Sequence, residues 1–325
     1  MSRDIASVDD LQKLMWSFAE HRVITVAGRV GILRHLAEGS TDIAEMATEL
    51  RLDPLATGKV VRALAALGLV EPEGARYRMK DSLAPHFRAG QMDLVPFLEH
   101  SHSLYDRWGE NLEFWVRGEP WKGKQRDADG VRKFGEAMQA MGANVARQVA
   151  AALDLKETRR MLDVGGGFGH YSMALLRANP GLRATVLDIS EVAALGREKA
   201  AGTEHENRIE FVASDYLEDD WGTGYDFVLL ANVLHQELAK SAASMVRKAA
   251  SALEPGGRLA VLDFSIDDAQ HENLLGALFA VNMRSFGDTY PEPTIKGWMQ
   301  ASGLTQLTRV DLNEFRWIIL GHREK

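Results

Sequence analysis

The chain contains no cysteine among its 325 residues. This absence excludes disulfide bonds, catalysis by a thiolate and zinc sites built from cysteine. Long apolar runs are also missing, because no stretch approaches the roughly 20 residues that a membrane span requires. The amino terminus carries Asp4, Asp9 and Asp10 instead of a basic segment followed by an apolar one. We therefore expect a cytoplasmic protein without a membrane partner.

Positive charge is scarce as well. Lys and Arg number 38 against 46 Asp and Glu, which gives a formal net charge of -8, and no basic block offsets it. Nucleic acid is therefore not an expected partner, because binding to phosphates depends on clustered cations. The ten histidines are scattered, and the one close pair, His100 and His102, would not share a face of a helix. We expect no bound metal.

The first 90 residues show a winged-helix pattern. Apolar residues recur at helical spacing over 10–37, a helix, a turn and a second helix follow over 41–70, and a return strand is expected at 76–79. Winged helices often bind DNA, but the second helix of this pair carries only two cations among alanines and leucines. That composition suits a helix that packs against protein. Residues 1–90 are thus expected to form a separate amino-terminal domain.

Two further regions follow. Residues 91–155 are predicted to form a helical linker whose methionines and aromatic residues could make adaptable walls for a flat apolar ligand. From residue 156 to residue 325, strands and helices alternate. Strands are expected at 160–164, 183–188, 208–213, 225–231, 257–264, 306–311 and 315–321. This alternation predicts an α/β domain with a Rossmann-like, doubly wound and mainly parallel sheet, which binds ligands beyond the carboxyl ends of its strands.

Four glycines crowd the turn after the first of these strands, in the segment Asp163-Val-Gly-Gly-Gly-Phe-Gly169. Glycine allows a positive φ and a close approach of a ligand to the backbone, and the next helix presents free N–H groups. A dinucleotide fingerprint, G-x-G-x-x-G, would require glycine where the chain has His170. The turn therefore favours a nucleotide-like cofactor other than NAD.

Acidic residues follow the next two predicted strands. The second strand ends in Asp188, about 20 residues after the glycines, where a carboxylate can accept hydrogen bonds from ribose hydroxyls. The third strand is followed by Ser214, Asp215 and Tyr216. Because parallel strands end at one edge of a sheet, these side chains are expected to surround the same cofactor.

Together these segments resemble the class I S-adenosylmethionine (SAM) methyltransferases. The glycine turn is similar to their motif I, Tyr225–Glu237 to the fourth-strand segment, and Leu253–Leu259 to the L-x-P-G-G-x-L turn. With the amino-terminal domain included, nearly the whole chain resembles small-molecule O-methyltransferases of the plant caffeate and bacterial polyketide type. The resemblance implies a homodimer formed through the amino-terminal domain. It also implies that SAM is held by Asp163, Gly165, Gly166, Gly167, Gly169, Asp188, Ser214, Asp215, Tyr216 and Asn232, with Asp215 on the adenine amino group.

His235 is the expected general base. The catalytic histidine of the family lies in an L-H-D-W-like segment, which Leu234–Glu237 resembles. A phenol, with a pKa of about 10, becomes a good nucleophile only when a base with a pKa of about 7 removes its proton. The resemblance implies that Asp263 orients the imidazole, and that a second acid is supplied by Glu292 or Asp288.

Two positions depart from the family pattern. Gln236 replaces the usual aspartate after the histidine, and Ala231 stands where many members carry a cation that contacts the cofactor. The predicted substrate wall comes from the helical linker and from the helix after the fifth strand. Its members are Phe97, His100, Tyr105, Trp108, Met138, Met141, Phe279, Asn282, Met283 and Phe286.

The leading hypothesis is in-line transfer of a methyl group from SAM to a hydroxyl of an aromatic or largely apolar metabolite, with S-adenosylhomocysteine as the second product. Relatives suggest a second possibility, in which the acceptor is nitrogen or carbon, or the enzyme catalyses decarboxylation, hydroxylation or cyclisation. A third possibility is a winged-helix regulator that binds DNA in response to a ligand. Analysis of products separates the first two, and a salt-dependent shift of duplex DNA would identify the third.

Overall fold

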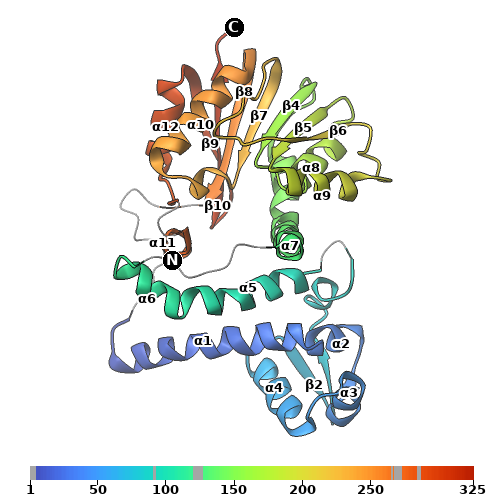
Figure 1. The fold of residues 1–325 in the computed structure, drawn as a ribbon. Coiled ribbons are helices and arrows are strands. Elements are labelled where there is room, and N and C mark those ends of the chain that lie inside the picture. The colour runs from blue at the N-terminus through green and yellow to red at the C-terminus, as the bar shows by residue number, and fades with distance from the viewer. Residues whose placement is uncertain (1–4, 91–92, 120–126, 265, 267–272, 284–286) are drawn as a thin grey trace. The chain divides into compact units, whose positions relative to one another are not determined.

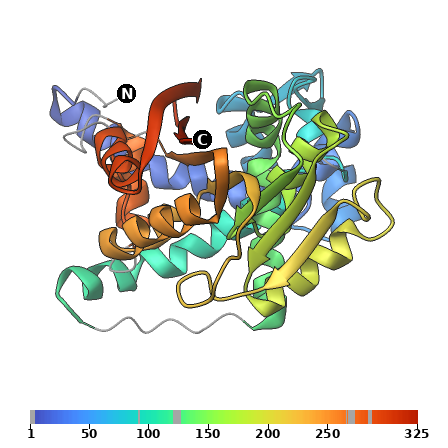
Figure 2. The same cartoon turned by 90° about the horizontal axis from the view of Figure 1, so that it is seen from above.

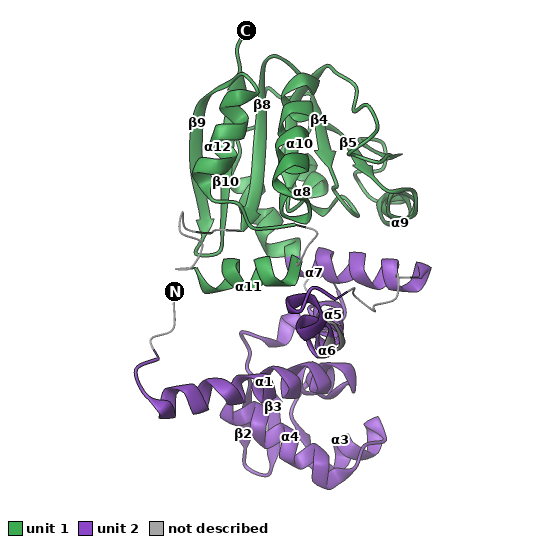
Figure 3. Cartoon of the chain, turned by 60° about the vertical axis from the view of Figure 1, so that its left-hand side comes forward, with its two compact units in different colours: residues 1–3, 142–325 green, residues 4–141 purple. Residues whose placement is uncertain are grey.

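The computed structural model describes residues 5–90, 93–119, 127–264, 266, 273–283 and 287–325, so that Phe286 lies outside the described residues. The chain divides into two compact units, one containing residues 4–141 and the other residues 142–325, as Figure 3 shows. The division falls within helix α7 (Ala128–Ala152). The domain boundaries expected after residues 90 and 155 remain predictions.

The unit of residues 4–141 is mainly helical. Its elements besides the start of α7 are α1 (Val8–Arg29), α2 (Ile32–Glu38), β1 (Thr41–Asp42), α3 (Ile43–Leu50), α4 (Pro54–Ala66), β2 (Val70–Glu73), β3 (Arg76–Met79), η1 (Ala84–His86), α5 (Val95–Trp108) and α6 (Glu110–Val116). The expected helix, turn, helix and return strand are all present, and the three strands pair in the order β1-β3-β2. The single helical stretch expected over 10–37 is instead two helices, because Gly31 between them adopts a left-handed φ of 89°.

Local sequence explains where the paired helices of this unit begin. Asp42 and Glu45 form a capping box at the start of α3, and the Asp53 side chain accepts from the backbone N–H of Ala56 in front of α4. Apolar side chains from both helices, among them Met46 and Leu64, are fully buried in the unit's own core. The burial of these side chains fixes the packing of the pair.

The unit of residues 142–325 is built around one seven-stranded sheet (Figures 1 and 2). Its elements are β4 (Arg160–Val164), α8 (His170–Ala178), β5 (Arg183–Asp188), α9 (Ser190–Ala200), β6 (Ile209–Ala213), β7 (Tyr225–Ala231), η2 (Leu234–Gln236), α10 (Ala239–Ala252), β8 (Leu253–Phe264), α11 (Leu274–Met283), α12 (Glu292–Ala301), β9 (Leu304–Asn313) and β10 (Arg316–Arg323). The strand order is β6-β5-β4-β7-β8-β10-β9. Strands β4 to β8 are parallel, and β9 and β10 are antiparallel, so the predicted Rossmann-like α/β fold is confirmed.

Alternation along the strands builds a core on each face of this sheet. In β7, Phe227 and Leu229 pack with residues of α7 and α8, whereas Val228 and Leu230 pack with residues of α10 and α12. Because both faces are covered, the carboxyl edge of the parallel strands is where loops and polar side chains gather. No helix in the described part of the chain is both long and apolar enough to cross a bilayer.

Candidate active site

The glycine turn between β4 and α8 has three residues in the left-handed region: Gly165, Gly167 and Gly169, with φ values of 65°, 60° and 75°. A Cβ atom on Gly166 would lie 2.7 Å from the carboxyl carbon of Asp163, so this glycine lets the turn pass directly over that side chain. On Gly167, by contrast, a Cβ would meet no described atom within 4 Å. The turn is therefore tightly packed underneath and open at Gly167.

Asp163 lies beneath the turn and is fully buried. Its Oδ2 atom accepts a hydrogen bond of 2.6 Å from the Ser172 hydroxyl, whereas its Oδ1 atom has no partner in the part of the chain that the structure describes. Burial raises the pKa of Asp163 to about 7, and the nearby charge of Asp188 adds to the shift. His170, the first residue of α8, also has an unpartnered Nδ1 atom, and burial lowers its pKa to about 4, which keeps it neutral.

Asp188 ends β5 and faces the same turn. Its two carboxylate oxygens accept hydrogen bonds of 2.8 Å from the backbone N–H groups of Gly167 and Ile189. These bonds orient the carboxylate and leave lone pairs for further donors, such as the paired hydroxyls of a ribose. After the next strand, the buried hydroxyl of Ser214 has no hydrogen-bond partner within the described ranges. Both groups fit a nucleoside.

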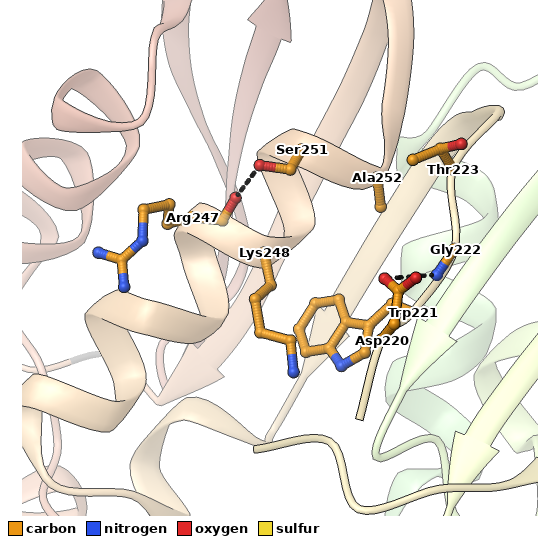
Figure 4. Close-up of a pocket in the computed structure, with 8 residues that line it drawn as sticks. All are labelled: Asp220, Trp221, Gly222, Thr223, Arg247, Lys248, Ser251 and Ala252. Carbon is orange, nitrogen blue, oxygen red and sulfur yellow. Dashed lines mark hydrogen bonds between the residues drawn. The ribbon is translucent and has the colours of Figure 1, made fainter. Parts of the chain in front are cut away.

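Lys248 of α10 fixes the loop that carries Asp215 and Tyr216. Its ammonium group donates to the carbonyl oxygens of Tyr216, Leu217 and Asp219, at 2.8, 3.1 and 2.6 Å. These bonds use all three of its donors. The same ammonium lies 4.9 Å from the centre of the Trp221 ring, as the close-up in Figure 4 illustrates. Nothing in the local sequence distinguishes Lys248 from a solvent-exposed helix residue, so its role was not predicted.

A cavity of about 230 Å³ opens beside Lys248 and Trp221 (Figure 4). It is lined by Asp220, Trp221, Gly222, Thr223, Arg247, Lys248, Ser251 and Ala252. These residues precede β7 and β8 in the chain, so the cavity adjoins the amino ends of these strands. It is therefore not the site that the predicted cofactor residues surround.

Asn232 connects β7 to the turn that carries His235. It is one of three described non-glycine residues with a positive φ, which is 54° here. Its side-chain amide donates to the Tyr171 hydroxyl at 2.9 Å, and its Oδ1 accepts from the Arg316 guanidinium at 2.5 Å. Its backbone oxygen accepts from the side chain of Gln236 at 2.9 Å. Predicted to contact SAM, Asn232 is thus also the centre of a hydrogen-bond network.

His235 and Asp263 lie together at the ends of β7 and β8. The imidazole Nδ1 is 2.6 Å from Asp263 Oδ1, and the two side chains are only 6% and 4% exposed. The backbone N–H of Phe264 donates to the same oxygen at 2.8 Å. Because a carboxylate accepts here, Nδ1 is assigned as the donor and Nε2 faces away from this bond as the second ring nitrogen. The structure brings the predicted pair together, while their catalytic roles stay predictions.

Three residues brace the turn around His235. A Cβ on Gly287 would lie 1.9 Å from the carbonyl oxygen of His235, so only glycine fits at that position. The Tyr290 hydroxyl donates to the backbone oxygen of Glu237 at 2.5 Å, and the Tyr216 hydroxyl donates to the Glu237 side chain at 2.9 Å. The last bond joins the loop after β6 to the loop after β7.

Glu292 has a different setting from the one expected of a second catalytic acid. Its carboxylate accepts from Lys296 at 2.5 Å and from Arg309 at 2.8 Å. Burial opposes ionisation of Glu292, but these hydrogen bonds outweigh it and lower the pKa. The alternative, Asp288, accepts from the backbone N–H of Thr289 at 2.8 Å. The hydrogen bond of the imidazole goes to Asp263, and a catalytic role for Glu292 stays a prediction.

The predicted substrate residues are divided between the two units. Phe279 of α11 lies edge-on to His235, with ring centroids 4.8 Å apart, and Asn282 and Met283 follow on the same helix. The remaining described members, Phe97, His100, Tyr105, Trp108, Met138 and Met141, belong to the unit of residues 4–141. The Tyr105 hydroxyl donates to the backbone oxygen of Phe18 at 2.7 Å, so it is bonded within its own unit. A role in substrate binding stays a prediction for all of them.

A search of the described residues finds no group of three or more His, Asp or Glu side chains that could hold a metal ion. Three groups at the carboxyl edge suit SAM. The carboxylate of Asp188 and the hydroxyl of Ser214 suit hydrogen bonds to the ribose, and the open face of Gly167 lets the cofactor approach the backbone closely.

Known proteins resemble this chain over nearly its full length. A family model described as an O-methyltransferase domain matches residues 108–292. The 3-hydroxy-5-methyl-1-naphthoate 3-O-methyltransferase of Streptomyces sahachiroi is 28% identical, over 93% of this chain and 90% of that protein. The tetracenomycin polyketide synthesis 8-O-methyl transferase TcmO of Streptomyces glaucescens is 26% identical, over 92% and 91%. The crystal structure of human N-acetylserotonin methyltransferase in complex with SAM has a TM-score of 0.87 at 22% identity, with 100% of both chains covered.

Proposed function

The chain belongs to the family of O-methyltransferase domain proteins and depends on SAM, and from this premise we propose that it methylates a hydroxyl group of an aromatic small molecule with His235 as the general base. The observation that carries the proposal is the 2.6 Å hydrogen bond between His235 Nδ1 and Asp263. It lies at the sheet edge that also holds the glycine turn. A base and a cofactor site therefore adjoin one another.

Bound SAM supplies a methyl group that is already activated by the sulfonium. Asp163, the glycine turn, Asp188, Ser214, Asp215, Tyr216 and Asn232 would hold it. His235 Nε2 accepts the proton of the acceptor hydroxyl as the oxygen attacks, and Asp263 stabilises the imidazolium that forms. General-base catalysis of this kind contributes about 10²- to 10⁴-fold to a rate. Alignment of the reacting atoms contributes the rest.

An aromatic acceptor is favoured by the surroundings of the imidazole. Phe279 lies edge-on to His235, and the Phe264 and Phe279 rings are 3.8 Å apart. Such a wall suits a flat apolar molecule. The two curated relatives described above are named for a hydroxynaphthoate and for a polyketide. We therefore assign hydroxylated aromatic compounds, rather than amines or carbon nucleophiles, as the acceptor class.

Transfer of labelled methyl from SAM tests this function. Phenols, catechols, hydroxynaphthoates and hydroxylated polyketides are offered in parallel with aryl amines, and the product bond is identified by mass spectrometry. Label in an aryl methyl ether supports the proposal. Label on nitrogen or carbon, or a decarboxylated, hydroxylated or cyclised product without label, contradicts it.

We also propose that the protein is a homodimer formed through α1. Four apolar residues of this helix, Val8, Leu11, Met15 and Phe18, recur at helical spacing, and their exposed fractions range from 48% to 69%. An exposed apolar stripe of this length is typical of an interface. Light scattering after gel filtration should give twice the monomer mass for the wild type and the monomer mass for Met15→Glu. Leu55→Glu, which alters an exposed leucine of α4, is the control and should remain a dimer; a monomeric wild type refutes the interface.

A further inference from the structure

Arg316, the first residue of β10, is a buried cation at the edge that carries His235. The residue is only 7% exposed. Burial lowers the pKa of its guanidinium, although Tyr171 and Asp263 act in the opposite direction. A buried charge is costly unless the protein gives it partners. The partners that the structure describes within bonding distance are neutral: the amide oxygen of Asn232 and the ring of Phe264.

The sheet places Arg316 against Phe264. Antiparallel pairing of β10 with β8 puts the two residues directly opposite one another, and the guanidinium carbon lies 3.6 Å from the centre of the ring. Phe264 is in turn close to the reacting groups. Its ring centroid is 5.4 Å from that of His235, and its backbone N–H donates to Asp263. A shift of Phe264 would therefore disturb both members of the catalytic pair.

The same guanidinium also holds Asn232. A non-glycine residue in the left-handed region is strained and persists only where its surroundings enforce it. Here Arg316 and Tyr171 bind the two ends of the Asn232 side-chain amide, and the Asn232 N–H donates to the Leu262 oxygen at 2.8 Å. The turn that carries His235 begins two residues later.

We propose that Arg316 is a positioning residue for His235: its guanidinium keeps Asn232 in the left-handed turn and Phe264 beside the imidazole at the same time. Arginine suits both tasks, because its planar group stacks on a ring with one face and donates hydrogen bonds from its edge. The inference rests on the proposed function in that it takes His235 to be the base. Arg316 itself touches no reacting atom.

The test compares Arg316→Met and Arg316→Lys with Arg258→Met as a matched control. Arg258 also approaches a phenylalanine of the sheet, with its guanidinium carbon 5.8 Å from the Phe227 ring, and bonds to the backbone oxygen of Asp154 at 2.7 Å. It pairs opposite His322 and lies six residues before Phe264, the last residue of β8, so it is away from the carboxyl edge. Circular dichroism sets a temperature at which every variant is folded.

Arg316→Met should lower kcat at saturating SAM and acceptor by about 10- to 100-fold, because small misplacements of reacting groups have effects of this size. Its calorimetric Kd for SAM should change less than its kcat, because Asn232 is only one of the residues expected to hold the cofactor. The kcat of Arg258→Met should stay within about twofold of the wild type. Arg316→Lys keeps a donor but loses the planar stack, so its kcat should be intermediate. If Arg316→Met does not fold, Tyr171→Phe removes the other partner of Asn232 and should lower kcat several-fold.

Combining Arg316→Met with His235→Ala separates this inference from the proposed function. If Arg316 acts through His235, the double variant is no slower than His235→Ala alone. Three results overturn the inference and leave the proposed function intact. In the first, the losses in kcat of the two single variants multiply in the double variant. In the others, kcat is unchanged in Arg316→Met, or it falls equally in Arg258→Met. If Arg316→Met binds SAM more weakly but keeps full kcat, the inference is overturned as well, and the guanidinium would instead bind the carboxylate of the cofactor. Full activity of His235→Ala instead refutes the general base of the proposed function, and with it the premise of this inference.

Discussion

The carboxyl edge of the sheet has two halves that are built in different ways. Around β4, β5 and β6, backbone N–H groups and glycines predominate, and three buried polar atoms have no partner among the described residues: Asp163 Oδ1, His170 Nδ1 and Ser214 Oγ. Around β7, β8 and β10, side chains bond to one another, as in the pairs of His235 with Asp263 and of Asn232 with Arg316. The first half suits a partner molecule that completes it, and the second is preorganised before any ligand arrives. Substitutions in the first should therefore change affinity, and substitutions in the second should change rate.

The largest effect should come from His235→Ala in the preorganised half. Loss of the base should lower kcat by about 10²- to 10⁴-fold, with the affinity for SAM unchanged. Steady-state kinetics with saturating substrates and titration calorimetry measure the two quantities. His322→Ala removes the same side chain near the far end of β10 and should keep full activity. A His235→Ala enzyme as fast as the wild type at neutral pH would refute the general base.

Gly167→Val tests the half around β4, β5 and β6, where substitutions should change the affinity for SAM. A β-branched residue at a φ of 60° is strained by about 1–3 kcal/mol, and relief of that strain would move the N–H that orients Asp188. We expect the Kd for SAM to rise about 5- to 150-fold, because a free energy of about 1–3 kcal/mol corresponds to a change of this size. Asp188→Ala should also raise the Kd for SAM. Gly181→Val is the control, because its Cβ would meet nothing and its φ is not in the left-handed region. Unchanged affinity in both Gly167→Val and Asp188→Ala would refute the assigned cofactor site.

Asp163→Asn tests the burial of an ionisable group in the first half, through the pH dependence of the free energy of unfolding. The pKa of Asp163 rises from 3.8 to about 7 on folding, so the folded protein holds a proton that the unfolded chain releases between these values. The contribution of Asp163 to wild-type stability is therefore fully present below pH 3.8 and is lost as pH rises through about 7, by at most about 1.4 kcal/mol per pH unit. The free energy of unfolding of Asp163→Asn, relative to that of the wild type, should therefore increase over this pH range and stay constant above it. Urea unfolding at several pH values measures the difference, and a difference independent of pH would contradict the burial of an ionisable group.

The smallest effect is expected from Lys248→Met, which acts on the cofactor half from outside. Three carbonyl bonds are lost, so the loop of Asp215 and Tyr216 loosens and the Kd for SAM should rise by up to about tenfold, the equivalent of about 1.4 kcal/mol. Arg247→Met, on the next residue of the same helix, removes only a bond to Ser244 within that helix and should leave the Kd unchanged. Equal Kd values for the two variants would show that Lys248 does not position the loop.

Predictability differs between the two halves for a physical reason. The glycine turn, the acid that ends β5 and the strand pattern are local features, in which a few consecutive residues determine the backbone. The network of Arg316, Asn232 and Tyr171 joins residues 61 and 84 positions apart, and no local pattern reports such a pairing. The family resemblance singled out Glu292 as an acid, yet it could not anticipate that Arg309 of β9 lies beside it.

The order of helices and strands, the conformation of the glycine turn and the placement of His235 after a strand follow from the amino-acid sequence, since hydrophobic periodicity and glycine act over a few residues. The tertiary structure alone decided which polar groups are buried together. It set the guanidinium of Arg316 on Asn232, which no pattern in the sequence implied, and it buried the pair of His235 and Asp263, which the family resemblance had implied. Desolvation makes these contacts strong, and desolvation exists only once distant segments have packed.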